Sequence, residues 1–393
     1  MTDNDRTIGI GMVGYAFMGQ AHSQGWRTVG HAYDLPLQPR MTAICGRNAE
    51  RVAAAAKRFG WESTETDWRA LVARDDIGIV DICTPGSSHA EIAIGALEAG
   101  KSVICEKPLA NSVEEARAMV EAAEAAASSG ARAMVAFNYR RVPAVAFARK
   151  LIADGRLGEI RHVRALYLQD WLLDPEFPLE WRLRAEIAGT GALGDLGAHI
   201  IDLVQFLTGD TVDSVLGLTE TFIKERPLPA GAGGGLSGGG ASGERGEVTV
   251  DDAALFLARM SGGAVASFEA TRFATGHKNG LTVEINGSKG SIIFDLERLN
   301  ELQVLDAEDP AAEQGFRRVL ITESDHPYME AWWPPGHIIG WEHTFTHEFA
   351  DFIRALDAGE QPRPSFADGL QVQQVLDAVV RSAAGGGWEK VSG

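Results

Sequence analysis

The stretch IGIGMVGYAFMG, residues 8–19, carries the strongest indication of the fold. Residues 8–13 are apolar and predict a buried strand, and the residues after them predict a turn that opens a helix. Gly9, Gly11 and Gly14 match the spacing G-x-G-x-x-G, but the first two lie inside the strand. A dinucleotide fingerprint works only at the turn from strand to helix, where backbone N–H groups meet a pyrophosphate. That position is occupied by Gly14, Tyr15, Ala16, Phe17, Met18 and Gly19.

This fingerprint departs from the usual pattern in two places. Ala16 replaces the middle glycine, and its methyl group would push a pyrophosphate slightly outward. The alternative is a helix start that binds no ligand. The second strand lacks the terminal acid that holds the ribose of NAD, since Cys45 is followed by Gly46 and Arg47. Arg47 could instead pair with a 2'-phosphate or stack on adenine, which favours NADP or the use of both cofactors. Asp34 lies 20 residues after Gly14, but Pro36 and Pro39 place it in a loop before the second strand, where it is expected to be solvated.

The first 138 residues alternate strands with helices, which is typical of a doubly wound parallel sheet. Strands are expected at residues 8–13, 41–45, 77–82, 102–105 and 133–137, and helices at 49–59, 90–99 and 113–128. After a helix at 142–153, alternating strands are expected at 161–168, 215–223, 253–260, 264–271 and 280–286, and helices at 341–356 and 366–383 close the chain. The sequence predicts a doubly wound parallel sheet over residues 1–138 and a second domain over 139–393 with a largely antiparallel sheet, one face of which is covered. Residues 230–246 hold nine glycines and predict a mobile loop.

Composition excludes several classes of protein. The chain has 393 residues, 45% of them hydrophobic, which is enough for two cores. A net charge of -18 argues against nucleic acid and anionic membrane surfaces as partners. The polar start and the lack of a long apolar run predict a cytoplasmic protein. Cys45, Cys83 and Cys105 are expected to be buried thiols, because their spacing fits neither disulfides nor a zinc site.

Polar turns follow three predicted parallel strands, at the edge where such sheets bind ligands. They are residues 83–89, the Glu106-Lys107-Pro108 turn and residues 138–141. The candidate cofactor contacts are therefore Gly14, Tyr15, Ala16, Phe17, Met18, Gly46, Arg47, Thr84, Pro85, His89, Glu106, Lys107 and Asn138.

Residues 191–202 carry a second polar pattern, in which Asp195 and His199 share one face if residues 195–206 are helical. A carboxylate beside an imidazole raises its basicity and orients it as a general base. A purely structural pair is the alternative. Residues 343 and 347 are histidines at helical spacing, but without a third ligand they predict no metal site.

The three turns and residues 191–202 together resemble the Gfo/Idh/MocA family of oxidoreductases, over essentially the whole chain and in the family's order. Residues 14–23, 170–171 and 332–337 resemble more narrowly its bacterial levoglucosan dehydrogenase branch. The resemblance implies a dinucleotide-binding Rossmann domain over residues 1–138. It implies an α/β substrate-binding and oligomerisation domain over residues 139–393, with a large, open, mostly antiparallel sheet that forms a homodimer or homotetramer. It also implies NAD as the cofactor, whereas Arg47 keeps NADP possible. It also implies Lys107 beside the nicotinamide, with Asp195 and His199 facing the substrate.

The expected reaction is oxidation of a secondary hydroxyl of a sugar, anhydrosugar or polyol, with levoglucosan and its 3-keto product as the first candidates. His199 would accept the hydroxyl proton while Lys107 stabilises the oxygen. Two alternatives stay open, a glycoside hydrolase that retains its NAD and a dinucleotide sensor without catalysis. The candidate sugar contacts are Tyr167, Gln169, Asp170, Trp171, Arg182 and His337.

Overall fold

The computed structural model describes residues 6–230 and 240–391, which form two compact units. Unit 1 combines the first 141 residues with 340–370, and unit 2 combines 142–339 with the chain from 371 onward. The sequence-based division after residue 138 places 340–370 with the second domain, whereas the structure groups these residues with unit 1. The reason is a helix, α9 (His343–Ala358), that packs on α1 (Phe17–Ala32).

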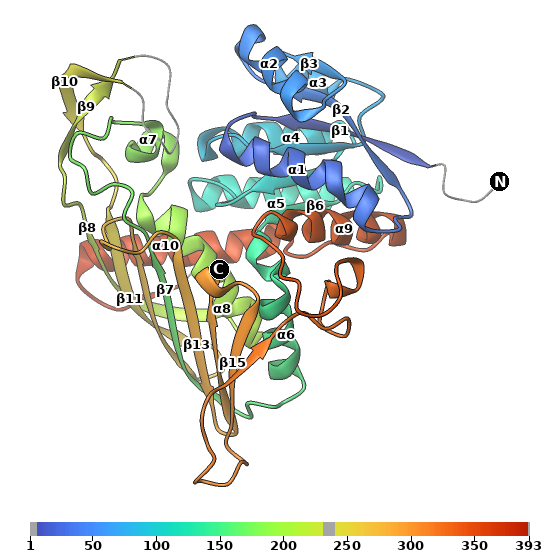
Figure 1. Cartoon of the computed structure of the whole chain (residues 1–393). Coiled ribbons are helices and arrows are strands. Elements are labelled where there is room, and N and C mark those ends of the chain that lie inside the picture. The colour runs from blue at the N-terminus through green and yellow to red at the C-terminus, as the bar shows by residue number, and fades with distance from the viewer. Residues whose placement is uncertain (1–5, 231–239, 392–393) are drawn as a thin grey trace. The chain divides into compact units, whose positions relative to one another are not determined.

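Unit 1 is built on a parallel sheet in the order β3-β2-β1-β4-β5-β6 (Figure 1). Its strands are β1 Thr7–Val13, β2 Gln38–Cys45, β3 Ser63–Glu65, β4 Ile79–Ile82, β5 Ser102–Glu106 and β6 Ala133–Ala136. The helices are α1, α2 Ala49–Phe59, α3 Trp68–Val72, α4 His89–Glu98, α5 Val113–Ala127 and α9. All residues of β4, β5 and β6 are buried, as expected for strands covered on both faces. The predicted doubly wound sheet is confirmed.

Helix α9 approaches α1 closely because α1 carries a glycine at the contact. A Cβ atom at Gly25 would lie 2.7 Å from the ring of Phe349. Next to it Trp26 stacks on Phe349 with ring centroids 3.9 Å apart. The sequence predicts α9 as a helix but gives no sign of this partner.

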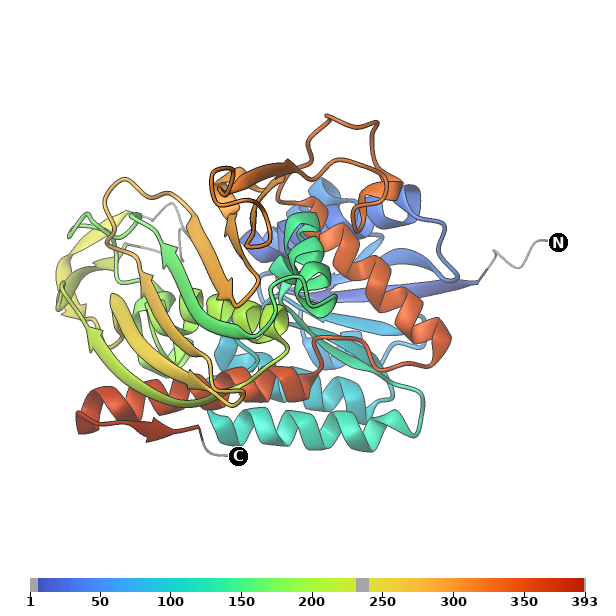
Figure 2. The same cartoon turned by 90° about the horizontal axis from the view of Figure 1, so that it is seen from below.

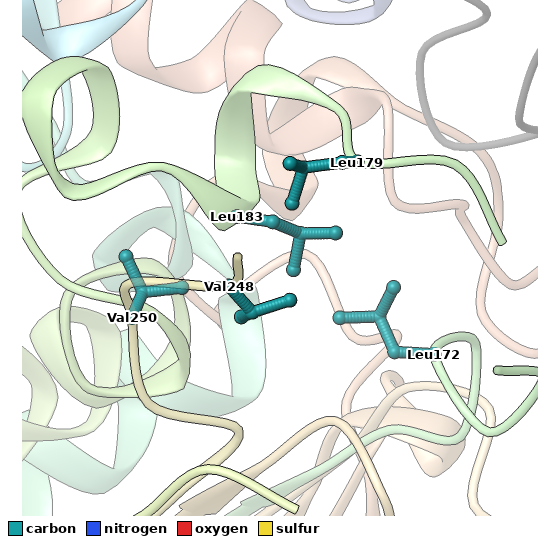
Figure 3. Close-up of a cluster of buried hydrophobic side chains, with 5 residues drawn as sticks. All are labelled: Leu172, Leu179, Leu183, Val248 and Val250. Atoms are coloured by element: carbon teal, nitrogen blue, oxygen red, sulfur yellow. The ribbon is translucent and has the colours of Figure 1, made fainter. Parts of the chain in front are cut away.

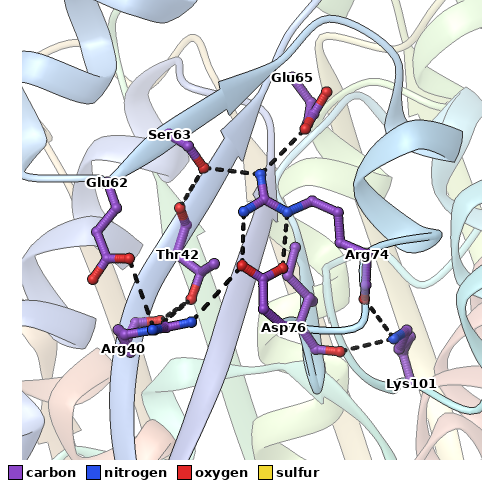
Figure 4. Close-up of polar contacts among 9 residues, drawn as sticks. Arg40, Thr42, Glu62, Ser63, Glu65, Arg74, Asp76 and Lys101 are labelled. Atoms are coloured by element: carbon purple, nitrogen blue, oxygen red, sulfur yellow. Dashed lines mark hydrogen bonds and ion pairs between the residues drawn. The ribbon is translucent and has the colours of Figure 1, made fainter.

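The short strand β3, which the sequence analysis missed, is held by a polar network around Arg74 (Figure 4). Its guanidinium donates to Ser63 Oγ at 2.9 Å, to Glu65 Oε1 at 3.2 Å and to both oxygens of Asp76. Lys101 donates to the backbone carbonyls of Arg74 and Ile77. The carboxylate of Glu65 is therefore engaged with Arg74 beside the end of β2.

Unit 2 contains a nine-stranded sheet in the order β16-β15-β14-β13-β7-β12-β11-β8-β17 (Figure 2). Among the described strands, β7 and β12 pair in parallel and the other neighbours are antiparallel. The strands are β7 Ile160–Leu168, β8 Val212–Glu220, β11 Ala253–Met260, β12 Val265–Thr271, β13 Gly280–Gly287, β14 Gly290–Asp295, β15 Glu301–Asp306, β16 Arg317–Leu320 and β17 Glu389–Lys390. The predicted open, mostly antiparallel sheet is confirmed, although β14 to β17 were not anticipated.

The helices of unit 2 lie largely against one face of this sheet, as Figure 2 shows for α8. They are α6 Pro143–Ala153, α7 Ala185–Ala188, a π-helix Leu193–Gly197 that continues into α8 Ala198–Thr208, and the part of α10 (Phe366–Gly385) that lies in unit 2. Within the described chain, Ala185–Thr208 is long and apolar enough to cross a membrane by length and composition alone. Its most apolar window is 72% buried inside the protein, which fits a core helix.

The prediction of a mobile loop over residues 230–246 is wrong for residues 241–246. Residues 241–246 belong to β10 (Ala241–Glu247), which pairs with β9 (Glu225–Pro229) in an antiparallel hairpin. Residues 231–239 lie outside the described residues. Glycine content alone misses this strand, because paired backbone groups order it without large side chains.

Candidate active site

The turn from β1 into α1 has the geometry of an anion site. Gly14 has a φ of +108°, and a Cβ atom there would lie 2.5 Å from the carbonyl oxygen of Cys83. Helix α1 starts at Phe17 after Ala16, with no capping side chain within the described chain and no acid in its first turn. The exposed N–H groups and positive dipole of such a helix start favour a phosphate group. Gly9 and Gly11 lie within β1, and Gly14 is the first residue after this strand.

The neighbouring side chains fit the rest of a dinucleotide. A Cβ atom at Gly46 would lie 2.0 Å from the ring of Tyr15, so Tyr15 covers the end of β2. Arg47 is exposed beyond that strand end, and Asp34 is exposed before β2. Phe17 is 48% exposed and stacks on Trp341 with centroids 5.7 Å apart. A flat aromatic and a cation at the end of β2 suit an adenosine, and the open helix start suits its pyrophosphate.

His89 connects two of the polar turns. It is buried, and its Nε2 lies 2.8 Å from the Thr84 carbonyl, while Nδ1 lies 3.0 Å from the Pro108 carbonyl. Burial lowers the pKa of His89. We assign to His89 the positioning of these turns, because its ring nitrogens face backbone carbonyls. Pro85 caps the short helical turn Gly86–Ser88 between them.

Glu106 is the last residue of β5 and Lys107 follows it; His22, which the sequence did not indicate, contacts the Glu106 carboxylate. Glu106 is buried, with Oε1 2.9 Å from His22 Nε2 and Oε2 accepting from the Lys107 backbone N–H at 3.0 Å. Lys107 is half-buried. In the third turn, Asn138 donates to Thr344 Oγ1 at 2.9 Å and is buried.

His22 also belongs to the one group in the described chain with metal-like geometry, together with Asp81 and Cys83, whose ligand atoms lie within 4.8 Å of one another. Both His22 nitrogens face carboxylates, however, and burial raises the pKa of Cys83, which keeps the thiol protonated. The group is therefore a hydrogen-bonded network. The His343 and His347 pair is also engaged, since His343 Nδ1 accepts from the Gly340 N–H and His347 Nδ1 faces the Arg141 carbonyl.

In unit 2, Asp251 shapes the turn before Asp195. Its carboxylate accepts from the N–H groups of Gly191 at 2.7 Å and Leu193 at 2.8 Å. Asp195 lies in the π-helix and His199 in the first turn of α8. A π-helical turn is rare and occurs frequently at functional sites.

Arg272 forms an ion pair with Asp195 and was not predicted from the sequence. Its Nη2 lies 2.9 Å from Asp195 Oδ2 and 3.2 Å from the Gly191 carbonyl. The Arg272 side chain is 1% exposed and that of Asp195 28%, so a buried cation faces a carboxylate that solvent or a ligand can reach. From the sequence, Asp195 is expected to orient His199. In the structure, the ion pair with Arg272 holds the Asp195 carboxylate.

Four of the candidate residues form a continuous network near His199. Tyr167 Oη and Gln169 Nε2 both donate to Asn279 Oδ1 at 2.8 Å. Trp171 Nε1 donates to Gln169 Oε1 at 2.9 Å, and the Tyr167 ring packs edge-on against His199 at 5.8 Å. The Arg272 guanidinium lies over Trp171, 5.6 Å from the ring centroid, and so links this network to Asp195.

Three predicted sugar contacts are engaged elsewhere. Asp170 pairs with Lys278 at 2.8 Å, and this hydrogen bond lowers the pKa of Asp170. Arg182 lies over the ring of Trp181 at 4.3 Å. His337 is exposed and donates from Nδ1 to the Pro334 carbonyl at 2.8 Å.

A small hydrophobic cluster fixes the segment after β7 that carries Trp171 and Arg182 (Figure 3). Trp171 and Phe177 pack against this cluster. Burying such aliphatic side chains stabilises the fold by about 1.5–3 kcal/mol each. Trp171 therefore has a rigid support. The members of the cluster are Leu172, Leu179, Leu183, Val248 and Val250.

Unit 1 carries a turn that suits a phosphate group, and unit 2 carries a polar cluster that includes Asp195; each feature is expected of a nicotinamide-dependent oxidoreductase. Residues 8–137 match the oxidoreductase family with an NAD-binding Rossmann fold, and residues 145–293 match the GFO/IDH/MocA C-terminal domain. The chain is 46% identical over 389 residues to levoglucosan dehydrogenase of Pseudarthrobacter phenanthrenivorans, covering 98% of both chains.

Solved structures agree with this match. A structure of levoglucosan dehydrogenase in complex with NADH and levoglucosan is 45% identical, with a TM-score of 0.91, and the match covers 98% of this chain and 100% of that one. An oxidoreductase domain protein from Kribbella flavida is 58% identical, with a TM-score of 0.94, covering 99% and 100%. The chain belongs to the GFO/IDH/MocA family of NAD-dependent oxidoreductases. Of the two cofactors that the sequence left open, the family description names NAD.

Proposed function

We propose that this protein oxidises levoglucosan, or a closely related sugar or polyol, to a keto sugar, with the 3-keto product as the first expectation. The 46% identity to a levoglucosan dehydrogenase over nearly the whole chain supports the substrate class. The observation that carries the proposal is a chain of contacts in unit 2, in which Tyr167 packs edge-on against His199 and Arg272 joins Trp171 to Asp195. It offers an aromatic face, hydrogen-bonding groups and a base, which are what a sugar hydroxyl requires.

In the proposed reaction His199 accepts the proton of the hydroxyl group. Asp195, fixed by Arg272, provides negative charge that favours the imidazolium formed in this step. Lys107 donates to the same oxygen and stabilises its developing charge. NAD, when bound, accepts the hydride from the carbon. Gly14 and the start of α1 hold its pyrophosphate, and Tyr15, Phe17 and Arg47 are the proposed contacts near the adenosine.

The test is formation of NADH, followed at about 340 nm, with NAD or NADP and a panel of levoglucosan, glucose, galactose, xylose and myo-inositol. We expect levoglucosan to give the fastest turnover. His199→Ala should lower turnover by about 10²- to 10⁴-fold while NAD binding persists. His31→Ala, which removes an exposed histidine on α1, is the matched control and should keep full activity.

Sugar hydrolysis without net NADH would instead favour the retained-cofactor hydrolase. Cofactor binding without turnover or hydrolysis of any sugar would favour a sensor. Full activity of His199→Ala would remove His199 from the mechanism.

We further propose that the sheet of unit 2 forms a homodimer or homotetramer. Strand β11 buries every second side chain from Ala254 and exposes Leu255 and Leu257 on its other face. Leu218 pairs with Leu255 in register and is 60% exposed, and Val265 on β12 is 44% exposed. Such an apolar face requires cover. Leu257→Glu should shift the mass measured by light scattering toward the monomer, and an unchanged mass would contradict the interface.

We place the protein in the cytoplasm. Cys45, Cys83 and Cys105 are all free and buried, which is compatible with a reducing compartment. Fractionation of the source cells tests this placement, and recovery in a secreted fraction would contradict it.

A further inference from the structure

His22, on α1, sits between two carboxylates at the ends of neighbouring strands. Its Nδ1 lies 2.9 Å from Asp81 Oδ1 on β4, and its Nε2 lies 2.9 Å from Glu106 Oε1 on β5. The imidazole is fully buried, and the rings of Phe345 and Phe349 pack against it at 5.1 and 5.3 Å. The ring therefore has little freedom to rotate.

The geometry fixes the charge of this ring. Carboxylate oxygens accept hydrogen bonds, so both ring nitrogens must carry a proton, and His22 is an imidazolium. Burial alone would lower the pKa of His22, but the charge of Asp81 raises it well above the ordinary value. Asp81 is itself held by Trp26, whose Nε1 donates to Oδ2 at 2.7 Å.

Glu106 transmits this arrangement to the next residue. While Oε1 is engaged with His22, Oε2 accepts from the Lys107 backbone N–H at 3.0 Å. The two oxygens of one carboxylate thus join α1 to the turn that carries Lys107. On the far side of the turn, His89 contacts the Pro108 carbonyl at 3.0 Å.

We infer that His22 is a positioning residue for Lys107, acting through the carboxylate of Glu106. The inference deepens the proposed function, because the position of Lys107 matters only if its ammonium group meets the reacting oxygen. A purely structural role would predict that loss of His22 lowers stability and leaves the Lys107 turn of the folded protein unchanged.

The decisive variant is His22→Gln. Glutamine has no charge and presents one N–H₂ group and one oxygen, so it cannot donate in both directions as the imidazolium does. Glu106 then loses its fixed orientation, and the Lys107 N–H loses its charge-assisted hydrogen bond. The matched control is His347→Gln, since His347 is fully buried in the same unit but its Nδ1 faces the Arg141 carbonyl.

A second variant, Glu106→Gln, guards against failure of His22→Gln to fold. The single amide oxygen of the glutamine cannot accept from both His22 and the Lys107 N–H, so this variant should change the Lys107 turn as His22→Gln does. If His22 acts through Glu106, the double variant should be no worse than the more affected single variant. Additive losses would show independent roles and overturn the inference.

The experiment is hydrogen exchange at the Lys107 amide of the folded protein, read by mass spectrometry, together with sugar turnover. Loss of one charge-assisted hydrogen bond should speed exchange in His22→Gln by about 10- to 100-fold, with no change in His347→Gln. The turnover number should fall by a similar factor, while the KM for NAD stays within about threefold. Exchange at the wild-type rate in folded His22→Gln or Glu106→Gln would overturn the inference. If the wild-type protein oxidises no sugar, the proposed function fails, but the exchange rates still decide the role of His22.

Discussion

Glu348 on α9 should make the stability of unit 1 depend on pH. Its side chain is fully buried, and neither carboxylate oxygen has a hydrogen-bond partner among the described residues. Burial raises the pKa of Glu348 to about 8, against an ordinary value of 4.5, although the cations Arg141 and His22 oppose this shift. The folded protein therefore holds a proton on Glu348 that the unfolded chain releases between these two values. The free energy of unfolding must fall as the pH rises through this range.

The magnitude follows from the size of the shift. At about 1.36 kcal/mol per pKa unit, a rise from 4.5 to about 8 corresponds to about 5 kcal/mol of stability that is present in acid and lost by about pH 8. Glu348→Gln removes the titrating group and keeps its shape. The difference in unfolding free energy between wild type and variant should therefore decrease by about 3–5 kcal/mol from about pH 5 to about pH 8.5.

The assay is urea unfolding of both proteins at several pH values, followed by hydrogen exchange of unit 1 peptides. Glu121→Gln, which neutralises an exposed glutamate of α5, is the control and should give a flat difference. Parallel stability curves for wild type and Glu348→Gln would refute a neutral Glu348 in the folded protein.

Two further changes test the two halves of the site. Gly14→Val should abolish NAD binding in a fluorescence titration. Gly14 has a φ of +108°, and a new Cβ atom would lie 2.5 Å from the Cys83 carbonyl oxygen. Unchanged NAD affinity in a folded variant would exclude this turn as the pyrophosphate site. Arg272→Met should lower turnover by at least about tenfold, because Asp195 loses its cation. Its melting temperature should also fall, because the substitution leaves the Asp195 carboxylate without its buried cation. A large loss of stability with full turnover would reverse this assignment.

The sequence predicted most of the strands and helices of unit 1, although not β3 or α3, because buried parallel strands and the longer helices between them have strong, regular patterns. The helix predicted at residues 49–59 matches α2, and the strand at 253–260 matches β11. Strand β3 was missed because three residues are too few to show a period. The grouping of 340–370 with unit 1 depends on packing between α1 and α9, which no local pattern reports.

Only part of the candidate site was predicted, again because a local sequence pattern does not report which distant strands pair. Lys107 and Asp195 stand in recognisable motifs, whereas Arg272 and Asn279 lie directly after β12 and directly before β13, where polar residues are common. Only the pairing of these strands with β7 brings them to Tyr167 and Trp171. His22 lies three residues after the fingerprint. A histidine on a mostly apolar helix face is the pattern from which His22 could have been predicted as a buried polar residue.

The most direct test of the central claim is to follow the hydride itself, using levoglucosan deuterated at C3 and NAD with the wild-type protein. If the protein oxidises this hydroxyl group, mass spectrometry should find one deuterium on the NADH formed for each 3-keto product. Release of a hydrolysed sugar with NAD unchanged, or NADH without deuterium, would contradict oxidation at that carbon.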